Sequence, residues 1–347
     1  MSGTWETQNK VLPGAYLNFR TNAPISITPG DRGIVVILQE VTTGNKGDIY
    51  TITATEADYP DGVTDADKLL ANESLKGANK VLVYNIGTAR DADAVTEALT
   101  ALRTIDFNVL VYPYNESSDS AIKTAIVTWL KSMREDEGVK CQAVLADHVA
   151  DSEAVINVVQ GVELEDGTLL TKAEVTAFVG GITAGANVNE SNTAKRYVGA
   201  IDVVPRMTKT EMEAAVTAGK FIFKVDTAQN VTVVTDINSL TTVTVDKGSM
   251  LKKNRVIRTI DGISNDVREI YESNYIGKVN NNEDGRSMLR ATLIEYFKEL
   301  QSMSAIQNFT EDDVTVDAGT DKDAVLIECN VPPVDSIEKI YINVNLS

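Results

Sequence analysis

The spacing of apolar and polar residues changes along this chain, and each spacing predicts a different kind of element. Between residues 65 and 160, short runs of consecutive apolar residues alternate with segments in which apolar residues recur every three or four positions. The runs lie at 81–84, 109–112 and 143–146. Continuous runs are typical of parallel strands buried on both faces, and periodic segments are typical of helices with one buried face. The pattern predicts an open, mostly parallel α/β sheet with right-handed crossovers.

The remaining segments predict a second, mixed part of the fold. Strands are expected at 33–41 and 48–54, a Gly/Asn-rich loop at 180–192 on the edge of the α/β unit, and a hairpin at 221–235 beyond a short helix. Two amphipathic helices follow, so the expected class is α/β and α+β, with the open sheet domain joined to a C-terminal α+β core. The predicted units are an N-terminal arm 1–32, a β-rich segment 33–64, the open α/β domain 65–196, the C-terminal core 197–333 and a C-terminal arm strand 334–347.

Two strand-like segments lie at the ends of the chain, where no neighbouring strand is available to them. Near the start, apolar and polar positions alternate between Pro and Gly residues, and the last eleven residues alternate in the same way. Terminal segments fray unless a sheet holds them, so both segments predict arms that pair with neighbouring molecules. The expected interface residues are Leu12, Ala15, Tyr16, Leu17, Phe19, Ile340, Tyr341, Ile342, Val344 and Leu346.

The charge balance disfavours two classes of partner. The chain has 32 Lys and Arg against 50 Asp and Glu, a net charge of −18, which is the wrong sign for neutralising the phosphates of nucleic acid or of an anionic membrane. No apolar run approaches the roughly 20 residues of a membrane-spanning helix. The two cysteines form no CxxC motif, and the N-terminus lacks the features of a secretory signal. These observations predict a protein that folds and stays in a reducing cytoplasm.

The sequence offers little catalytic chemistry. His148 is the only histidine, so a multi-histidine metal site is excluded, and it follows a predicted strand at the edge where α/β sheets bind ligands. A cytoplasmic α/β enzyme of unknown substrate, using Asp147 and His148, is therefore the alternative function, although no adjacent nucleophile is marked and a surface histidine is the favoured interpretation. The glycines at 180–185 lack the flanking elements of a phosphate-binding loop, and the acidic runs lack the spacing of a calcium loop. No cofactor or metal is expected.

A basic cluster contrasts with the acidic whole. Its members are Lys247, Lys252, Lys253, Arg255 and Arg258, followed later by Arg286 and Arg290. One interpretation is that these are charges at helix ends that pair with the many carboxylates. The other is a docking patch for an acidic partner.

An ordered set of motifs gives the chain a family resemblance. The segments KKNRVIRTIDGISNDV, YIGKVNNNEDGRSML, SAIQNF and VPPVDSIEKIYINVNL, all in the C-terminal third, are similar in order and spacing to signatures of the phage tail sheath family. TKTEMEAAVTAGKFIF, DINSLTT and the N-terminal LPGAYLNF extend the similarity over nearly the whole chain. The chain most resembles the short sheaths of Gram-positive phages, defective prophages and R-type bacteriocins.

The resemblance implies a non-enzymatic assembly subunit without a cofactor. It implies that six copies form a ring around a tail tube, that rings stack helically, and that the arms at 12–20 and 334–346 add strands to sheets of adjacent copies. A baseplate trigger would then convert the extended sheath to a shorter, wider one that drives the tube through a target envelope. Implied partners are other copies, the tube, the baseplate and the tail terminator, in a tail made in the bacterial host cytoplasm. The resemblance places Lys252, Lys253, Arg255, Arg286 and Arg290 as residues facing the tube. A secretion-system sheath would divide these roles between two chains.

Overall fold

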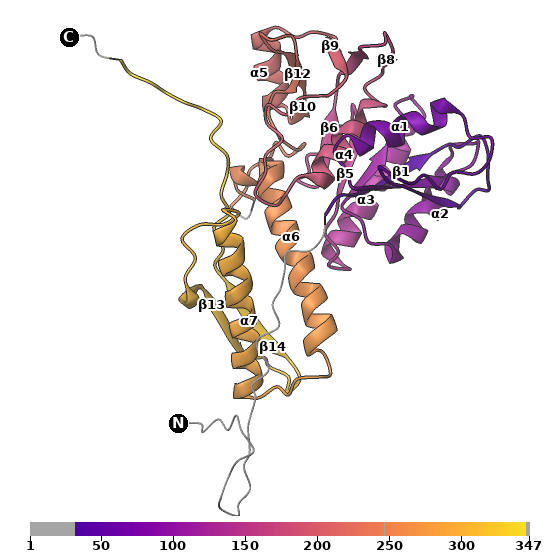
Figure 1. The fold of residues 1–347 in the computed structure, drawn as a ribbon. Helices are drawn as coiled ribbons and strands as arrows, with labels where there is room; N and C mark the ends of the chain where they lie inside the picture. The colour runs from indigo at the N-terminus through magenta and orange to yellow at the C-terminus, as the bar shows by residue number, and fades with distance from the viewer. Residues whose placement is uncertain (1–31, 246, 345–347) are drawn as a thin grey trace, which may run out of the picture.

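A seven-stranded sheet forms the centre of the computed structural model, which describes residues 32–245 and 247–344 (Figure 1). Its strand order is β10-β6-β5-β4-β1-β3-β2, and every neighbouring pair is parallel except β2 with β3. The strands are β1 Ile34–Gln39, β2 Ile49–Ile52, β3 Lys80–Asn85, β4 Val109–Tyr112, β5 Gln142–Ala146, β6 Val155–Val158 and β10 Lys220–Phe221. The prediction of an open, mostly parallel α/β sheet is confirmed.

Helices cover both faces of this sheet. They are α1 Asp65–Leu75 and α4 Val175–Gly185 on one face, and α2 Ala92–Ala101 and α3 Asp119–Glu135 on the other. Successive residues of a strand point to opposite faces, so in β1 Val35 and Ile37 join the first core, and Val36 and Leu38 join the second. Burial on both faces explains why the central strands read as uninterrupted apolar runs.

The expected loop at 180–192 is wrong in its first half, because Gly180, Gly181 and Gly185 belong to α4. Helix α4 lies in the core against α1, not at the edge of the unit. A Cβ atom on Gly181 would lie 2.0 Å from the Ser74 carbonyl oxygen, and one on Gly185 would lie 1.8 Å from that of Gly77. The glycines therefore let two helix backbones approach closely, and this packing outweighs the low helix propensity that favoured a loop.

We expect Gly181→Ala to lower the free energy of unfolding by about 1–3 kcal/mol, although alanine is the better helix former. The added methyl group must push α4 away from the end of α1, which loosens the core between them. Urea denaturation followed by circular dichroism measures the change. Gly248→Ala is the matched control, because its Cβ meets only Met250 at 4.0 Å. A Gly181→Ala chain as stable as the parent would contradict the packing argument.

Smaller sheets extend the α/β body. A three-stranded antiparallel sheet has the order β8-β7-β9, and the predicted hairpin is present as β11 and β12 with short helix α5 before it. The bounds are β7 Gly161–Leu164, β8 Leu169–Leu170, β9 Ala200–Val204, α5 Lys209–Thr217, β11 Phe223–Val225 and β12 Val231–Val233. Phe221, expected in the hairpin, pairs instead with Val158 at the edge of the main sheet.

The C-terminal core consists of two long helices and a hairpin. Helices α6 Asn254–Ile270 and α7 Glu283–Ser302 run in opposite directions below the sheet, and the hairpin of β13 Val314–Ala318 and β14 Val325–Cys329 packs beside them (Figure 1). A π-helical turn, Tyr271–Tyr275, ends α6. The two helices confirm the prediction, whereas the two strands were not singled out from the sequence.

Buried polar contacts fasten α6 to the α/β body. The Arg134 guanidinium on α3 donates two hydrogen bonds, of 2.6 and 2.8 Å, to the two carboxylate oxygens of Asp261. One turn further, the Asn265 side chain accepts from the Lys140 backbone N–H at 2.9 Å and donates to its carbonyl at 2.8 Å. Paired bonds of this kind fix orientation as well as distance, so α6 is held in one position against the body.

Candidate functional site

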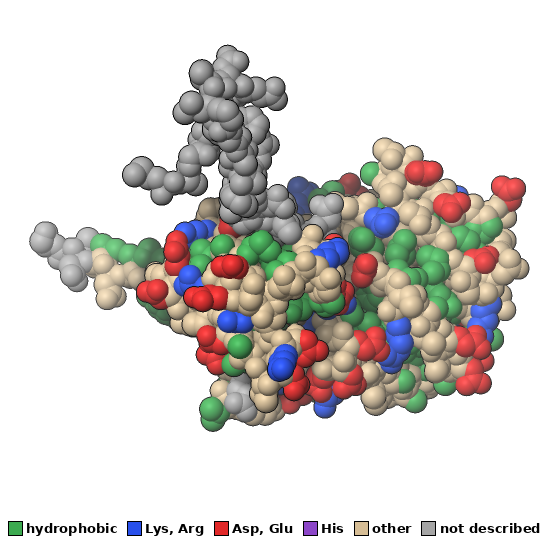
Figure 2. Space-filling model, turned by 90° about the horizontal axis from the view of Figure 1, so that it is seen from below, with side chains coloured by type: hydrophobic (Ala, Val, Ile, Leu, Met, Phe, Trp, Pro, Cys, Tyr) green, Lys and Arg blue, Asp and Glu red, His purple; other side chains and the backbone are tan. Residues whose placement is uncertain are grey.

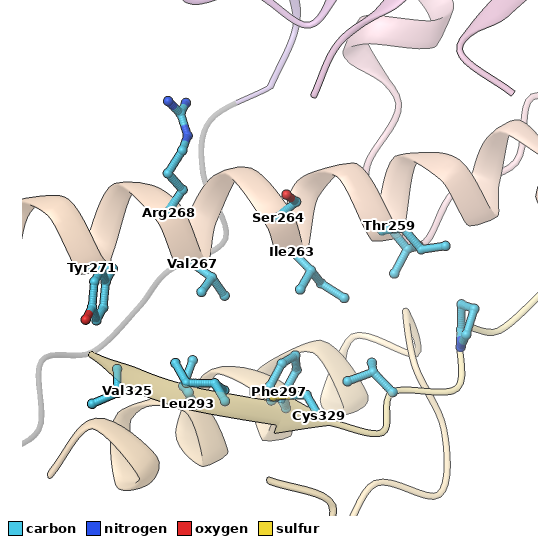
Figure 3. Close-up of a pocket in the computed structure, with 14 residues that line it drawn as sticks. Thr259, Ile263, Ser264, Val267, Arg268, Tyr271, Leu293, Phe297, Val325 and Cys329 are labelled. Atoms are coloured by element: carbon cyan, nitrogen blue, oxygen red, sulfur yellow. The ribbon is translucent and has the colours of Figure 1, made fainter. Parts of the chain in front are cut away.

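An open apolar groove of about 640 Å³ lies between α6 and β14. Ile263 and Val267 of α6 and Tyr271 of the π-helical turn point into it, while Leu293 and Phe297 of α7 form its floor (Figure 3). The groove is also lined by Thr259, Ile260, Ser264, Arg268, Val325, Ile327, Cys329, Val331 and Pro333. Apolar side chains thus line a surface on which a further segment could be buried.

The sequence of α6 explains why one of its faces is left uncovered. Arg258, Asp261 and Asn265 recur at the spacing of one helix face, and this polar face docks on the α/β body. Ile263 follows Asp261 by two positions, and Val267 follows Asn265 by two positions. Their side chains therefore lie about 200° around the helix axis from the polar face. Figure 3 shows the result: Ile263 and Val267 are directed into the groove, whereas the guanidinium of Arg268 points to the other side of α6.

Strand β14 presents an unpaired edge beside this groove. Within residues 247–344 it pairs only with β13, in an antiparallel ladder from Val325 to Cys329. Figure 3 shows β14 lying across the groove from α6. The second edge of such a strand carries backbone N–H and C=O groups that can accept another strand.

The C-terminal segment is exposed and has no partner strand among residues 32–245 and 247–344. Ile340, Ile342 and Val344 are 75%, 77% and 74% exposed, and residues 334–344 form no strand. The segment leaves the body as a thin extension with hydrophobic side chains towards its end (Figure 2). Apolar side chains at alternate positions, held in solvent, suit a strand that is buried only after assembly. That Ile340, Tyr341, Ile342 and Val344 form an interface stays a prediction.

The predicted N-terminal arm cannot be placed in the same way. Leu12, Ala15, Tyr16, Leu17 and Phe19, and also Leu346, lie outside the described residues. Their assignment to an interface stays a prediction.

The basic cluster is largely engaged within the chain. Arg258 is fully buried and donates to the Thr183 and Glu190 carbonyl groups, with Asp236 at 3.5 Å. Arg255 is also buried and donates to the Ser304 carbonyl. The remaining members pair as Lys247 with Glu153, Lys252 with the Thr241 carbonyl, and Lys253 with Glu338. These contacts favour the interpretation as charges satisfied by the chain's own acceptors.

The two groups of expected tube-facing residues do not form one patch. Lys252, Lys253 and Arg255 lie at the start of α6, whereas Arg286 and Arg290 lie on the first turns of the antiparallel α7. Because α6 has 17 residues, its two ends are about 25 Å apart. Arg286 bonds to Asn281, and Arg290 bonds to the carbonyl groups of Val314 and Glu311. Contact with a tube stays a prediction for all five residues.

The sheet edge at Asp147 and His148, suggested for enzyme chemistry, carries charged side chains that do not form one cluster. Asp147 pairs with Lys172 at 2.6 Å, and the His148 backbone N–H donates to Asn157. Burial lowers the pKa of His148, and the neighbouring Lys123 lowers it further. Within residues 32–245 and 247–344, no hydroxyl or thiol bonds to the His148 ring, and His, Cys, Asp and Glu side chains form no metal-binding group of three or more. None of the helices in the same residues combines the length and apolar character that a bilayer crossing needs.

Family models cover almost all of the described chain. Residues 32–86 match the tail sheath protein Gp18 domain III N-terminal region, residues 88–239 match the phage tail sheath protein central domain, and residues 246–347 match the phage tail sheath C-terminal domain. The tail sheath protein of Clostridium phage phiCD119 is 30% identical over 306 residues, which cover 86% of this chain and 83% of the relative. The chain belongs to the phage tail sheath family.

Two further relatives come from Bacillus subtilis. The uncharacterized protein YqbK and the phage-like element PBSX protein XkdK are 33% and 32% identical to this sheath chain, each over 88% of its length. Both relatives are longer, and the match spans 66% and 65% of them. Resemblance to the family was therefore a correct prediction, and the family is one of structural proteins.

Solved sheath structures have the same fold. The sheath tail protein from Desulfitobacterium hafniense is 33% identical, with a TM-score of 0.83 over 95% of this sheath chain and 99% of that one. The helical sheath of the anti-feeding prophage in its contracted state is 16% identical, with a TM-score of 0.74 over 97% of this chain and 100% of that one. The sheath fold is thus retained at low sequence identity.

Proposed function

We propose that this chain is a contractile sheath subunit that polymerises by strand donation, its C-terminal segment adding to β14 of a neighbouring copy. The observation that carries the proposal is the unpaired edge of β14 beside an apolar groove, in a chain that also exposes an apolar strand-like segment. Donated strands gain affinity from backbone hydrogen bonds and register from alternate side chains. The same chain supplies both halves of the junction, so the contact repeats from copy to copy.

The apolar residues of the segment supply the energy of the junction. Full burial of an aliphatic side chain contributes about 1.5–3 kcal/mol, so Ile340, Ile342 and Val344 together contribute roughly 4–9 kcal/mol before the cost of association is subtracted. Val325 and Ile327 of β14, with Ile263 and Val267 of α6, offer the complementary apolar surface. One junction is therefore of moderate strength, and a lattice with many junctions is stable.

The wider assembly follows the resemblance to known sheaths. In the proposal, six copies form a ring around a tail tube, rings stack helically, and the sheath shortens and widens to drive the tube through an envelope. Contraction uses no nucleotide, because subunits that gain a few kcal/mol each on repacking release enough free energy together. The tail tube, baseplate and tail terminator are the partners, and the subunit is made in the bacterial cytoplasm before it joins the tail.

Electron microscopy of the purified chain tests this proposal. We expect hollow tubes of uniform width, with six-fold symmetry in end views and a helical repeat along the axis. The expected tubes form without nucleotide or metal ions. A chain that remains monomeric at millimolar concentration, or that forms only irregular aggregates, would overturn the proposal.

A further inference from the structure

The segment that joins β14 to the exposed C-terminal strand is anchored to the body. The Gln307 backbone N–H donates to the Pro332 carbonyl at 3.0 Å, and the Val334 N–H donates to the Ala305 carbonyl at 3.0 Å. The consecutive prolines Pro332 and Pro333 restrict this stretch further, because each fixes its own φ. We call residues 331–338 the arm root.

Glu338 forms the last contact of the arm root with the body. Its carboxylate pairs with Lys253 at the start of α6 and accepts a hydrogen bond of 2.7 Å from the Thr193 hydroxyl. The two charged side chains are only 23% and 14% exposed, so this ion pair is better shielded from solvent than an ordinary surface pair. We call the contacts of Glu338 with Lys253 and Thr193 the arm clasp.

The charges around the arm clasp favour the seated position of the root. Asp335 lies near Arg255. Burial lowers the pKa of Arg255, and the negative charge of Asp335 opposes part of that lowering. Two acidic residues of the arm root thus face two basic residues at the start of α6. Beyond Glu338 the chain leaves the body, and in Figure 1 it runs away from β14 and α7.

Because of the order of elements, the C-terminal segment could bind to β14 of its own chain instead of β14 of a neighbouring copy. The exposed segment from residue 340 onwards is the next strand-like segment after β14, so residues 330–339 could form the loop of a hairpin that lays this segment against the β14 edge of the same molecule. A short linker presents its segment at an effective concentration of about millimolar. In a micromolar solution, self-insertion would therefore exceed donation to another copy by about 1,000-fold unless the fold opposes it.

We propose that the arm clasp opposes self-insertion by directing the C-terminal strand away from its own groove. The inference rests on the proposed strand donation and adds how the site is kept open for another copy. While Glu338 is seated on Lys253 and Thr193, the chain cannot turn back towards β14, so both the groove and the strand remain available to neighbours.

Charge reversal of the clasp tests this inference. Glu338→Lys places two cations together and releases the arm root. We expect monomers whose groove is occupied by their own C-terminal segment. Tube formation should then need at least a ten-fold higher protein concentration. Hydrogen exchange of the monomer reports the occupancy, because inserted strands slow the exchange of amides at 325–329. The double variant Lys253→Glu with Glu338→Lys restores the pair and should restore assembly. Lys322→Glu, an exposed lysine outside the clasp, is the control.

The milder Glu338→Gln variant removes the charge while keeping an acceptor for Thr193, and it should shift assembly in the same direction by a smaller factor. Thermal melts identify any variant that is merely unfolded. The inference is overturned if folded Glu338→Lys and Glu338→Gln chains assemble at the parental concentration with unprotected β14 amides. A chain without residues 339–347 distinguishes failure of strand donation from failure of the clasp. If this truncated chain forms tubes, strand donation itself is overturned. If the truncated chain forms no tubes but the Glu338→Lys chain assembles like the parent, only the role of the clasp is overturned.

Discussion

A chain lacking residues 339–347 is expected to fold normally and to remain monomeric at concentrations where the intact chain forms tubes. Ile340, Ile342 and Val344 are mostly exposed in the single chain, so their removal costs the monomer little. In the proposed assembly the same residues would contribute roughly 4–9 kcal/mol per junction, so we expect their loss to raise the dissociation constant by at least about 1,000-fold. Sedimentation velocity measures the assembly state, and circular dichroism melting measures the fold.

A chain with Thr at positions 340, 342 and 344 is the matched control for length. Threonine keeps the β-branched shape and the strand propensity but removes much of the apolar surface. It should assemble weakly, between the intact and truncated chains. Tubes of normal width from the truncated chain would show that the junction lies elsewhere.

Val267→Asp is expected to prevent assembly from the other side of the junction. Val267 is half-buried in the wall of the groove, so the monomer tolerates a carboxylate there in contact with water. Under a docked strand the same carboxylate loses its water, which costs several kcal/mol and raises the assembly concentration about 100-fold or more. Light scattering over a concentration series measures the threshold. Glu269→Lys changes a charge on an exposed part of the same helix and should leave the threshold unchanged.

Mixing the two defective chains gives a sharper test of the pairing. The truncated chain keeps an intact groove, and the Val267→Asp chain keeps an intact C-terminal segment. Native mass spectrometry should therefore detect a one-to-one complex in the mixture and monomers in each separate sample. Assembly of Val267→Asp alone at the parental concentration would contradict a role for the groove.

Residues with local patterns could be placed from the sequence, and residues that depend on distant neighbours could not. The runs at 81–84 and 109–112 became β3 and β4 because continuous apolar residues suit a strand buried on both faces. Gly181 was misplaced because its helix is stabilised by close approach to Ser74, more than 100 positions away in the chain. No local rule reports such a contact.

Only half of the proposed junction could be predicted from the sequence. The alternation around Ile340 and Ile342 marked a strand in need of a partner, but the partner's groove exists only because α6 and β14 come together in space. The alternation of Val314 and Val316, and of Val325 and Ile327, was a usable signal for β13 and β14 that was missed. Arg258 carries no mark in the sequence to distinguish a buried arginine from the surface charges around it.

Helix α6 has a mechanical consequence for the assembled sheath. Its polar face is held against the α/β body by the two hydrogen bonds between Arg134 and Asp261, and its apolar face forms one wall of the groove. A pull on a donated strand therefore passes through β14 and the groove into α6, and from α6 into the central sheet. In the sheath that we propose, tension applied at one junction would turn the whole body, and a rotation started at one end would pass to the next subunit.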